Sequence, residues 1–145
     1  MATTRSAAPL LPPLLTSRPP ALRVVLAGVV PLAFGALCGW ALGVSAALYL
    51  VLAVPVAILG GFGAGIEHLG PRSGAQRGAI GGLLFGTAIV VTHDLIGGGA
   101  EVSQSDPAIL LAVVTCLTGA LLGAAGGALR ARLESRAPAP AASRG

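Results

Sequence analysis

Apolar residues occur in long runs along this chain, and ionisable residues interrupt them at only a few places. From Val24 to Ile66 the sequence contains no Asp, Glu, Lys, Arg or His. One membrane-spanning helix needs about 20 apolar residues, so this run is long enough for two of them. Because no polar segment separates the two halves, we expect a tight helical hairpin with spans at about 22–42 and 44–66 and a minimal turn near Gly43.

A third span is predicted after the polar break at Glu67–Ser73. Only Gly78–Thr92 is free of ionisable groups, and this stretch is short for a full crossing. Arg77 and Asp94 stand at its two ends, where their charged groups can extend along the helix to the two membrane interfaces. We therefore expect the third span at about 75–96.

The fourth span is predicted at about 107–129, with its helix continuing to about Ser135. Asp106 can cap the free amide groups of the first turn. Pro107 has no N–H that would need a partner at that position. The sequence Ser105-Asp106-Pro107 therefore favours a helix start.

Proline-rich segments lie at both ends of the chain. In the first segment, prolines remove backbone donors too often for a helix to begin. We therefore predict a disordered tail at 1–22, a four-helix transmembrane domain at 23–135 and a second disordered tail at 136–145. A secretory signal is the competing interpretation of the first tail, with Leu10–Leu15 as its apolar core, although two prolines break that core.

The composition agrees with this pattern. Of the 145 residues, 54% are hydrophobic and only 10% are charged, whereas a soluble domain carries about 25% charged residues. So few charges cannot cover a surface that faces water, and a soluble globular domain is excluded. The predicted fold class is an all-α membrane protein, a four-transmembrane-helix bundle with glycine-mediated helix packing.

All nine basic residues are arginines, and the four-span arrangement places them on one side of the membrane. The positive-inside rule then predicts a multi-pass protein of the cell membrane with both termini in the cytoplasm. The net charge of +4 is explained as an orientation signal, so the expected partner is the lipid bilayer and no nucleic acid. Three arginines after the fourth span are expected to anchor its end or to bind anionic lipid headgroups: Arg130, Arg132 and Arg136.

Small residues recur at intervals of four within every predicted span. A step of four residues advances by about 400° around a helix, so each set forms a nearly straight groove on one face. In lipid such grooves allow the close backbone approach that joins helices. These faces either hold the four helices of one chain together or bind a second copy or another membrane protein. The predicted helix-packing residues are Gly35, Gly39, Gly43, Gly61, Gly65, Gly78, Gly82, Gly86, Gly119, Gly123 and Gly127.

Asp94, with His93 beside it, is the candidate for chemistry, because an ionisable residue near or within a span often marks an ion or proton path. The alternative is that both are ordinary helix-end residues at the interface. Cys38 and Cys116 are interpreted as small apolar packing residues. The sequence contains none of the common hydrolase, metalloprotease or nucleotide-binding motifs, and we predict no catalytic residue, metal site or cofactor.

The sequence therefore predicts a small integral membrane protein that is not an enzyme. Few polar residues would face a pore, which favours a structural, accessory or regulatory role exercised through the helix faces. The alternative is an oligomeric transporter or channel for small solutes or ions.

Overall fold

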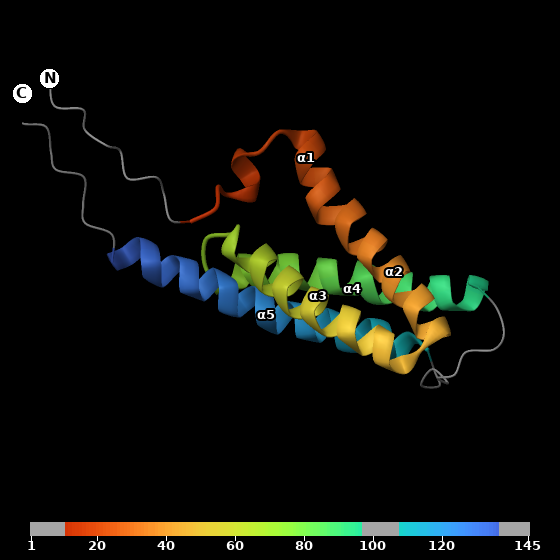
Figure 1. Cartoon of the computed structure of the whole chain (residues 1–145). Helices are drawn as coiled ribbons and strands as arrows, with labels where there is room; N and C mark the ends of the chain where they lie inside the picture. Colours follow the sequence, from red (N-terminus) through yellow and green to blue (C-terminus); the bar gives the residue numbers. More distant parts are fainter. Residues whose placement is uncertain (1–10, 97–107, 137–145) are drawn as a thin grey trace, which may run out of the picture.

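The computed structural model describes residues 11–96 and 108–136, most of which are helical (Figure 1). A short 3-10 turn, η1 (Leu15–Ser17), precedes the first long helix. That helix comprises α1 (Pro20–Val24), the π-helical turn η2 (Val25–Val29) and α2 (Val30–Val44). The other long helices are α3 (Ala46–Ile66), α4 (Pro71–Ile96) and α5 (Ile109–Arg136). The described residues contain no strand, and the predicted all-α fold is confirmed.

Each of the four long helices has the length and apolar character needed to cross a membrane. Large apolar side chains cover their outer faces. Leu59, Leu95 and Leu121 are each more than two-thirds exposed, at 72%, 80% and 73%. A surface of this kind is unfavourable in water and suits the hydrocarbon of a bilayer. The helices therefore indicate a multi-pass membrane protein.

The helix boundaries differ from the predicted ones at the hairpin and at the start of α4. The break between α2 and α3 is the single extended residue Ser45. Its N–H donates to the carbonyl of Ala41 (2.9 Å), and its carbonyl accepts from the N–H of Tyr49 (3.0 Å). Gly43, where the sequence predicts the turn, lies inside α2. The helix α4 begins at Pro71 rather than near residue 75, because proline is well suited to the first turn of a helix.

The helices α4 and α5 form the central pair of the bundle. They make the most extensive contact between any two elements, and α2 packs against α4 while α3 packs against α5. In Figure 1, α1 and the first part of α2 rise away from the other three helices. The first helix therefore contacts the bundle over part of its length only.

The central pair approaches to backbone distance at glycine positions. A Cβ atom added to Gly78 would overlap the carbonyl oxygen of Gly119, and one added to Gly119 would overlap that of Gly78. The same reciprocal relation holds between Gly74 and Gly123. Any side chain at these four positions would force the two backbones apart.

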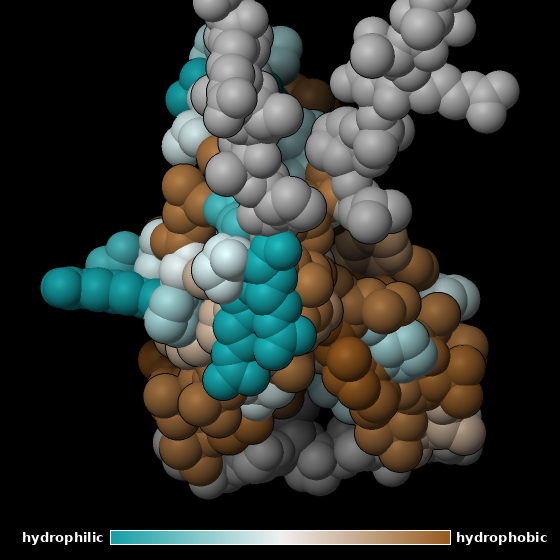
Figure 2. All heavy atoms as spheres, turned by 90° about the vertical axis from the view of Figure 1, so that its left-hand side faces the viewer, coloured by the Kyte–Doolittle hydropathy of each residue, from teal (hydrophilic) through white to brown (hydrophobic). Residues whose placement is uncertain are grey.

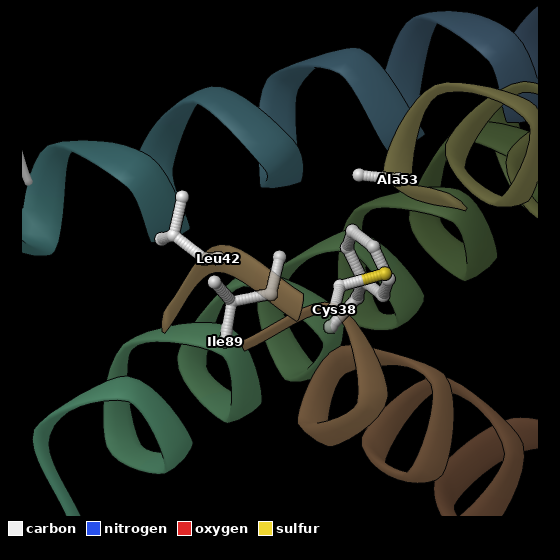
Figure 3. Packing of buried hydrophobic residues seen from close by; sticks show 5 residues of the cluster. Cys38, Leu42, Ala53 and Ile89 are labelled. Atoms are coloured by element: carbon white, nitrogen blue, oxygen red, sulfur yellow. The ribbon is translucent and has the colours of Figure 1, made fainter. Parts of the chain in front are cut away.

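A small cluster of buried side chains joins α2, α3 and α4 near the hairpin (Figure 3). Cys38 and Ile89 are fully buried, and Leu42, Ala53 and Phe85 pack around them. This cluster fixes the end of α2 that lies next to the hairpin. The divergence of the first helix is therefore confined to its other end.

The described arginines gather at the end of the bundle where α1 and α4 begin and where α3 and α5 end. We call this the Arg-rich end. Figure 2 looks onto it and shows hydrophilic side chains surrounded by hydrophobic surface. The residues are Arg18, Arg23, Arg72, Arg77, Arg130, Arg132 and Arg136.

Candidate functional site

The helices α2 and α3 diverge toward the Arg-rich end (Figure 1). A cleft lies between them there. The first helix is held against α4 at Gly35 and Gly39, where added Cβ atoms would overlap the carbonyl oxygens of Phe85 and Ile89. Past this crossing the helices leave a cavity of about 600 Å³. Its lining is mostly apolar and comes from the first helix, α3, α4 and α5.

The divergence coincides with a local change in the first helix. In η2 the N–H of Val30 donates to the carbonyl of Val25, five residues earlier. The residue five positions after Leu26 is Pro31, which has no N–H to donate. The carbonyl oxygen of Leu26 accepts instead from Nη2 of Arg77 in α4, at 2.7 Å. Arg77 therefore bridges α4 and the first helix across the end of the cleft.

Arg77 is the single charged residue in the lining of the cleft, which consists of described residues only. Its Nε and Nη1 atoms are buried and have no hydrogen-bond partner within residues 11–96 and 108–136. A Cβ atom at Gly81 would lie 3.0 Å from Nη1, so this glycine leaves room for the guanidinium to lie along α4. The cleft thus combines an apolar lining with one cation that retains unused donors.

The chain before α1 crosses the Arg-rich end as an N-terminal strap, residues 11–19. Leu15 is buried, and its N–H donates to the carbonyl of Glu67 at the end of α3 (3.1 Å). Nη2 of Arg18 pairs with Oε1 of the same glutamate at 2.6 Å. The sequence predicts a disordered tail over 1–22, and the structure differs here because Glu67 offers the strap both a carbonyl and a carboxylate. Residues 1–10 lie outside the described residues.

Arg130 joins the strap to the ends of α3 and α5. Its side chain is only 8% exposed. Nη1 donates to the carbonyls of Ile66 (2.7 Å) and Pro12 (2.8 Å), and Nε donates to Oε1 of Glu134 (2.7 Å). The last carbonyls of a helix have no intrahelical donor, so this guanidinium satisfies the end of α3. Nε and Nη1 of Arg130 are thus engaged within the chain, and the binding of lipid headgroups by this arginine stays a prediction.

The structure places the predicted packing glycines at contacts between helices of the same chain, with one exception. Added Cβ atoms at nine of them would come within 3.1 Å of another helix, and one at Gly127 would overlap the carbonyl oxygen of Gly70, just before α4. The exception is Gly43, where an added Cβ meets no described atom within 4 Å. Gly126, outside the period of four on α5, also makes a close contact, with the carbonyl of Phe62 on α3. The ten are Gly35, Gly39, Gly61, Gly65, Gly78, Gly82, Gly86, Gly119, Gly123 and Gly127.

His93 and Asp94 lie in the last turn of α4, at the end opposite to the Arg-rich end. Asp94 is exposed, whereas His93 is partly buried and its Nδ1 has no partner in the described part of the chain. Within that part, no group of three or more His, Cys, Asp or Glu residues is placed to hold a metal ion. An ion path at Asp94 stays a prediction.

Sequence reasoning missed the two arginines that bridge elements. From the sequence alone, Arg77 is interpreted as a residue whose side chain extends to the membrane interface, and Arg130 as an anchor of the span end. A proline within a predicted span signals a free carbonyl, and Pro31 gives that signal for the first helix. The sequence does not indicate which donor would reach it.

Comparison with known proteins found no family model, no curated protein and no solved structure that matches this chain.

Proposed function

We propose that the protein is an accessory or regulatory component of the cell membrane that acts by binding a hydrocarbon ligand within the bilayer. The cleft between α2 and α3 is the observation that supports this most directly. Its volume of about 600 Å³ falls within the range of about 300–1,000 Å³ that is usual for ligand sites. Its mostly apolar lining suits a hydrocarbon occupant better than water or a hydrated ion.

We also propose that the glycine faces serve to hold the four helices of one chain together. In support of this, Gly74, Gly78 and Gly82 of α4 all lie against the backbone of α5. Gly86 also lies against α5, at Ala112 and Thr115, so this glycine face of α4 is already covered within one chain. The exposed apolar side chains, which lie on all four long helices, form the surfaces left for lipid or for another membrane protein.

The proposed orientation places the Arg-rich end in the cytoplasm, following the positive-inside rule. We expect a reporter fused after Gly145 and a reporter inserted within Gly97–Gly99 to report opposite sides of the membrane. The measurement is the paired activity of a reporter that works only in the cytoplasm and one that works only outside it. Reporters on the same side would contradict the four-span arrangement.

Transport is the second candidate function, and the polar groups inside the cleft, Arg77, Thr115 and Thr118, are the observation that favours it. Under the first proposal, purified protein in liposomes is expected to pass protons, K⁺ and Cl⁻ no faster than empty vesicles do. The measurement is dye-detected ion flux. Flux above this background would instead establish a channel or transporter, and its loss in Asp94→Asn would place the path at Asp94.

A further inference from the structure

We propose that the cleft between α2 and α3 holds an acyl chain of an anionic phospholipid, and that Arg77 binds the phosphate of this lipid. The inference rests on the proposed membrane embedding and leaves open whether the protein is accessory or a transporter. It joins two observations on the same cavity. One is the buried and unused donors of Arg77, and the other is the apolar lining beside them.

Arg77 forms no salt bridge with the described acidic residues of the Arg-rich end, although Glu67 lies near enough to attract its charge. Glu67 forms its ion pair with Arg18, and Glu134 forms its ion pair with Arg130. The contact that Arg77 makes is with the carbonyl of Leu26, which is a neutral acceptor. A buried charge in a membrane is costly unless it meets an opposite charge, and a guanidinium presents a fork of donors that matches a phosphate.

The position of Arg77 along α4 suits a lipid phosphate. The 26 residues of α4 give a helix of about 39 Å at about 1.5 Å per residue. The hydrocarbon core is about 30 Å thick, so a centred helix projects about 4–5 Å beyond it at each end. Arg77 lies six residues after Pro71, about 9 Å into the helix. In this structure its guanidinium lies along α4 toward Gly81, which is deeper in the bilayer. When the lipid is bound, we expect the long side chain to turn back toward the Arg-rich end and the level of the phosphates.

The wall formed by α3 leaves space for the chain of the lipid. Gly60 lines the cleft, and an added Cβ there would meet no described atom within 4 Å. Ala57 and Ala64 line the same wall and have short side chains. A lipid chain can lie along this wall while its phosphate reaches Arg77 at the Arg-rich end.

The experiment is native mass spectrometry of the full chain in detergent, with dioleoylphosphatidylglycerol and dioleoylphosphatidylcholine added in equal amounts. We expect the wild-type protein to retain the anionic lipid with a preference of about tenfold or more, the factor that one charge-assisted hydrogen bond provides. Arg77→Met is expected to reduce this preference to within about twofold on the same grounds. The matched control is Arg132→Met, which removes an exposed arginine from the same end and is expected to keep the preference.

Two further arms keep the proposal testable if Arg77→Met does not fold. Gly60→Phe fills the cleft and is expected to lower retention of both lipids, whereas Gly63→Phe is expected to change nothing. Gly63 lies on the same helix outside the cleft lining, and an added Cβ there also meets open space. Glycerol phosphate, the headgroup without acyl chains, is expected not to displace the lipid.

Equal retention of the two lipids by the wild type overturns the proposal. So does an unchanged preference in a folded Arg77→Met, equal binding by Gly60→Phe and Gly63→Phe, or displacement by glycerol phosphate.

Discussion

Replacement of Gly123 by leucine is expected to leave little folded monomer. An added Cβ at this position would overlap the carbonyl oxygen of Gly74 on α4, and a leucine extends further in the same direction. The obstacle is a helix backbone, which cannot turn aside as a side chain can. Extra atoms in a packed interior cost about 1–3 kcal/mol even where neighbours can adjust, and we expect a greater loss of stability here. The measurement is size-exclusion chromatography of detergent-extracted protein, followed by thermal unfolding monitored by circular dichroism.

The matched control for this change is Gly63→Leu. Gly63 lies on α3, is exposed and has open space where a Cβ would stand. We expect this variant to elute and unfold like the wild type, because its side chain would face lipid. If Gly123→Leu unfolds at the same temperature as Gly63→Leu, the close contact between α4 and α5 is not what holds the bundle together.

The four helices could be predicted from the sequence because the signal for a membrane span is local. The absence of ionisable residues from Val24 to Ile66 is enough to predict two spans, whatever they pack against. The exact position of the turn between the first two helices could not be predicted from the sequence. Gly43 is a common turn residue, yet the chain reverses at Ser45, where a single extended residue follows α2. Either residue could end a helix, and the packing of Leu42 and Cys38 against Ile89 fixes how far α2 continues.

The cleft could not be predicted, because it depends on contacts between residues far apart in the chain. Arg77 and Leu26 are 51 positions apart, and a hydrogen bond between a side chain and a backbone carbonyl leaves no periodic trace in a sequence. The spacing of glycines predicts a helix face, but it does not show which helix lies opposite. Gly126 illustrates this limit, since it lies outside the period of four and faces α3 rather than α4.

At the Arg-rich end, the number of arginines predicts which side of the membrane this end faces. It does not show what each arginine does. Arg130 and Arg132 are two residues apart and contribute equally to the positive-inside rule. A separation of two residues places them on different faces of α5. Arg130 is consequently buried among three acceptors, while Arg132 is exposed. This difference allows one of the two to be removed as a control for the other.

Arg130→Met is expected to release the N-terminal strap and to destabilise the Arg-rich end. Methionine retains an apolar stem of similar length but has no donor, so the carbonyls of Ile66 and Pro12 lose their partner. Hydrogen bonds from a charged group contribute about 1.5–3 kcal/mol, so we expect a loss of that order. The measurement is hydrogen–deuterium exchange of residues 11–18, with attention to Leu15, whose N–H is bonded to Glu67 in the wild type.

Arg132→Met provides the matched control, because it removes the same side chain from an exposed site on the same helix. We expect exchange in residues 11–18 to become faster in Arg130→Met and to remain at the wild-type rate in Arg132→Met. Equal exchange in the two variants would mean that the ion pair of Arg18 with Glu67 and the burial of Leu15 hold the strap without Arg130. Faster exchange in Arg130→Met alone would identify its buried guanidinium as the group that fastens the strap to α3 and α5.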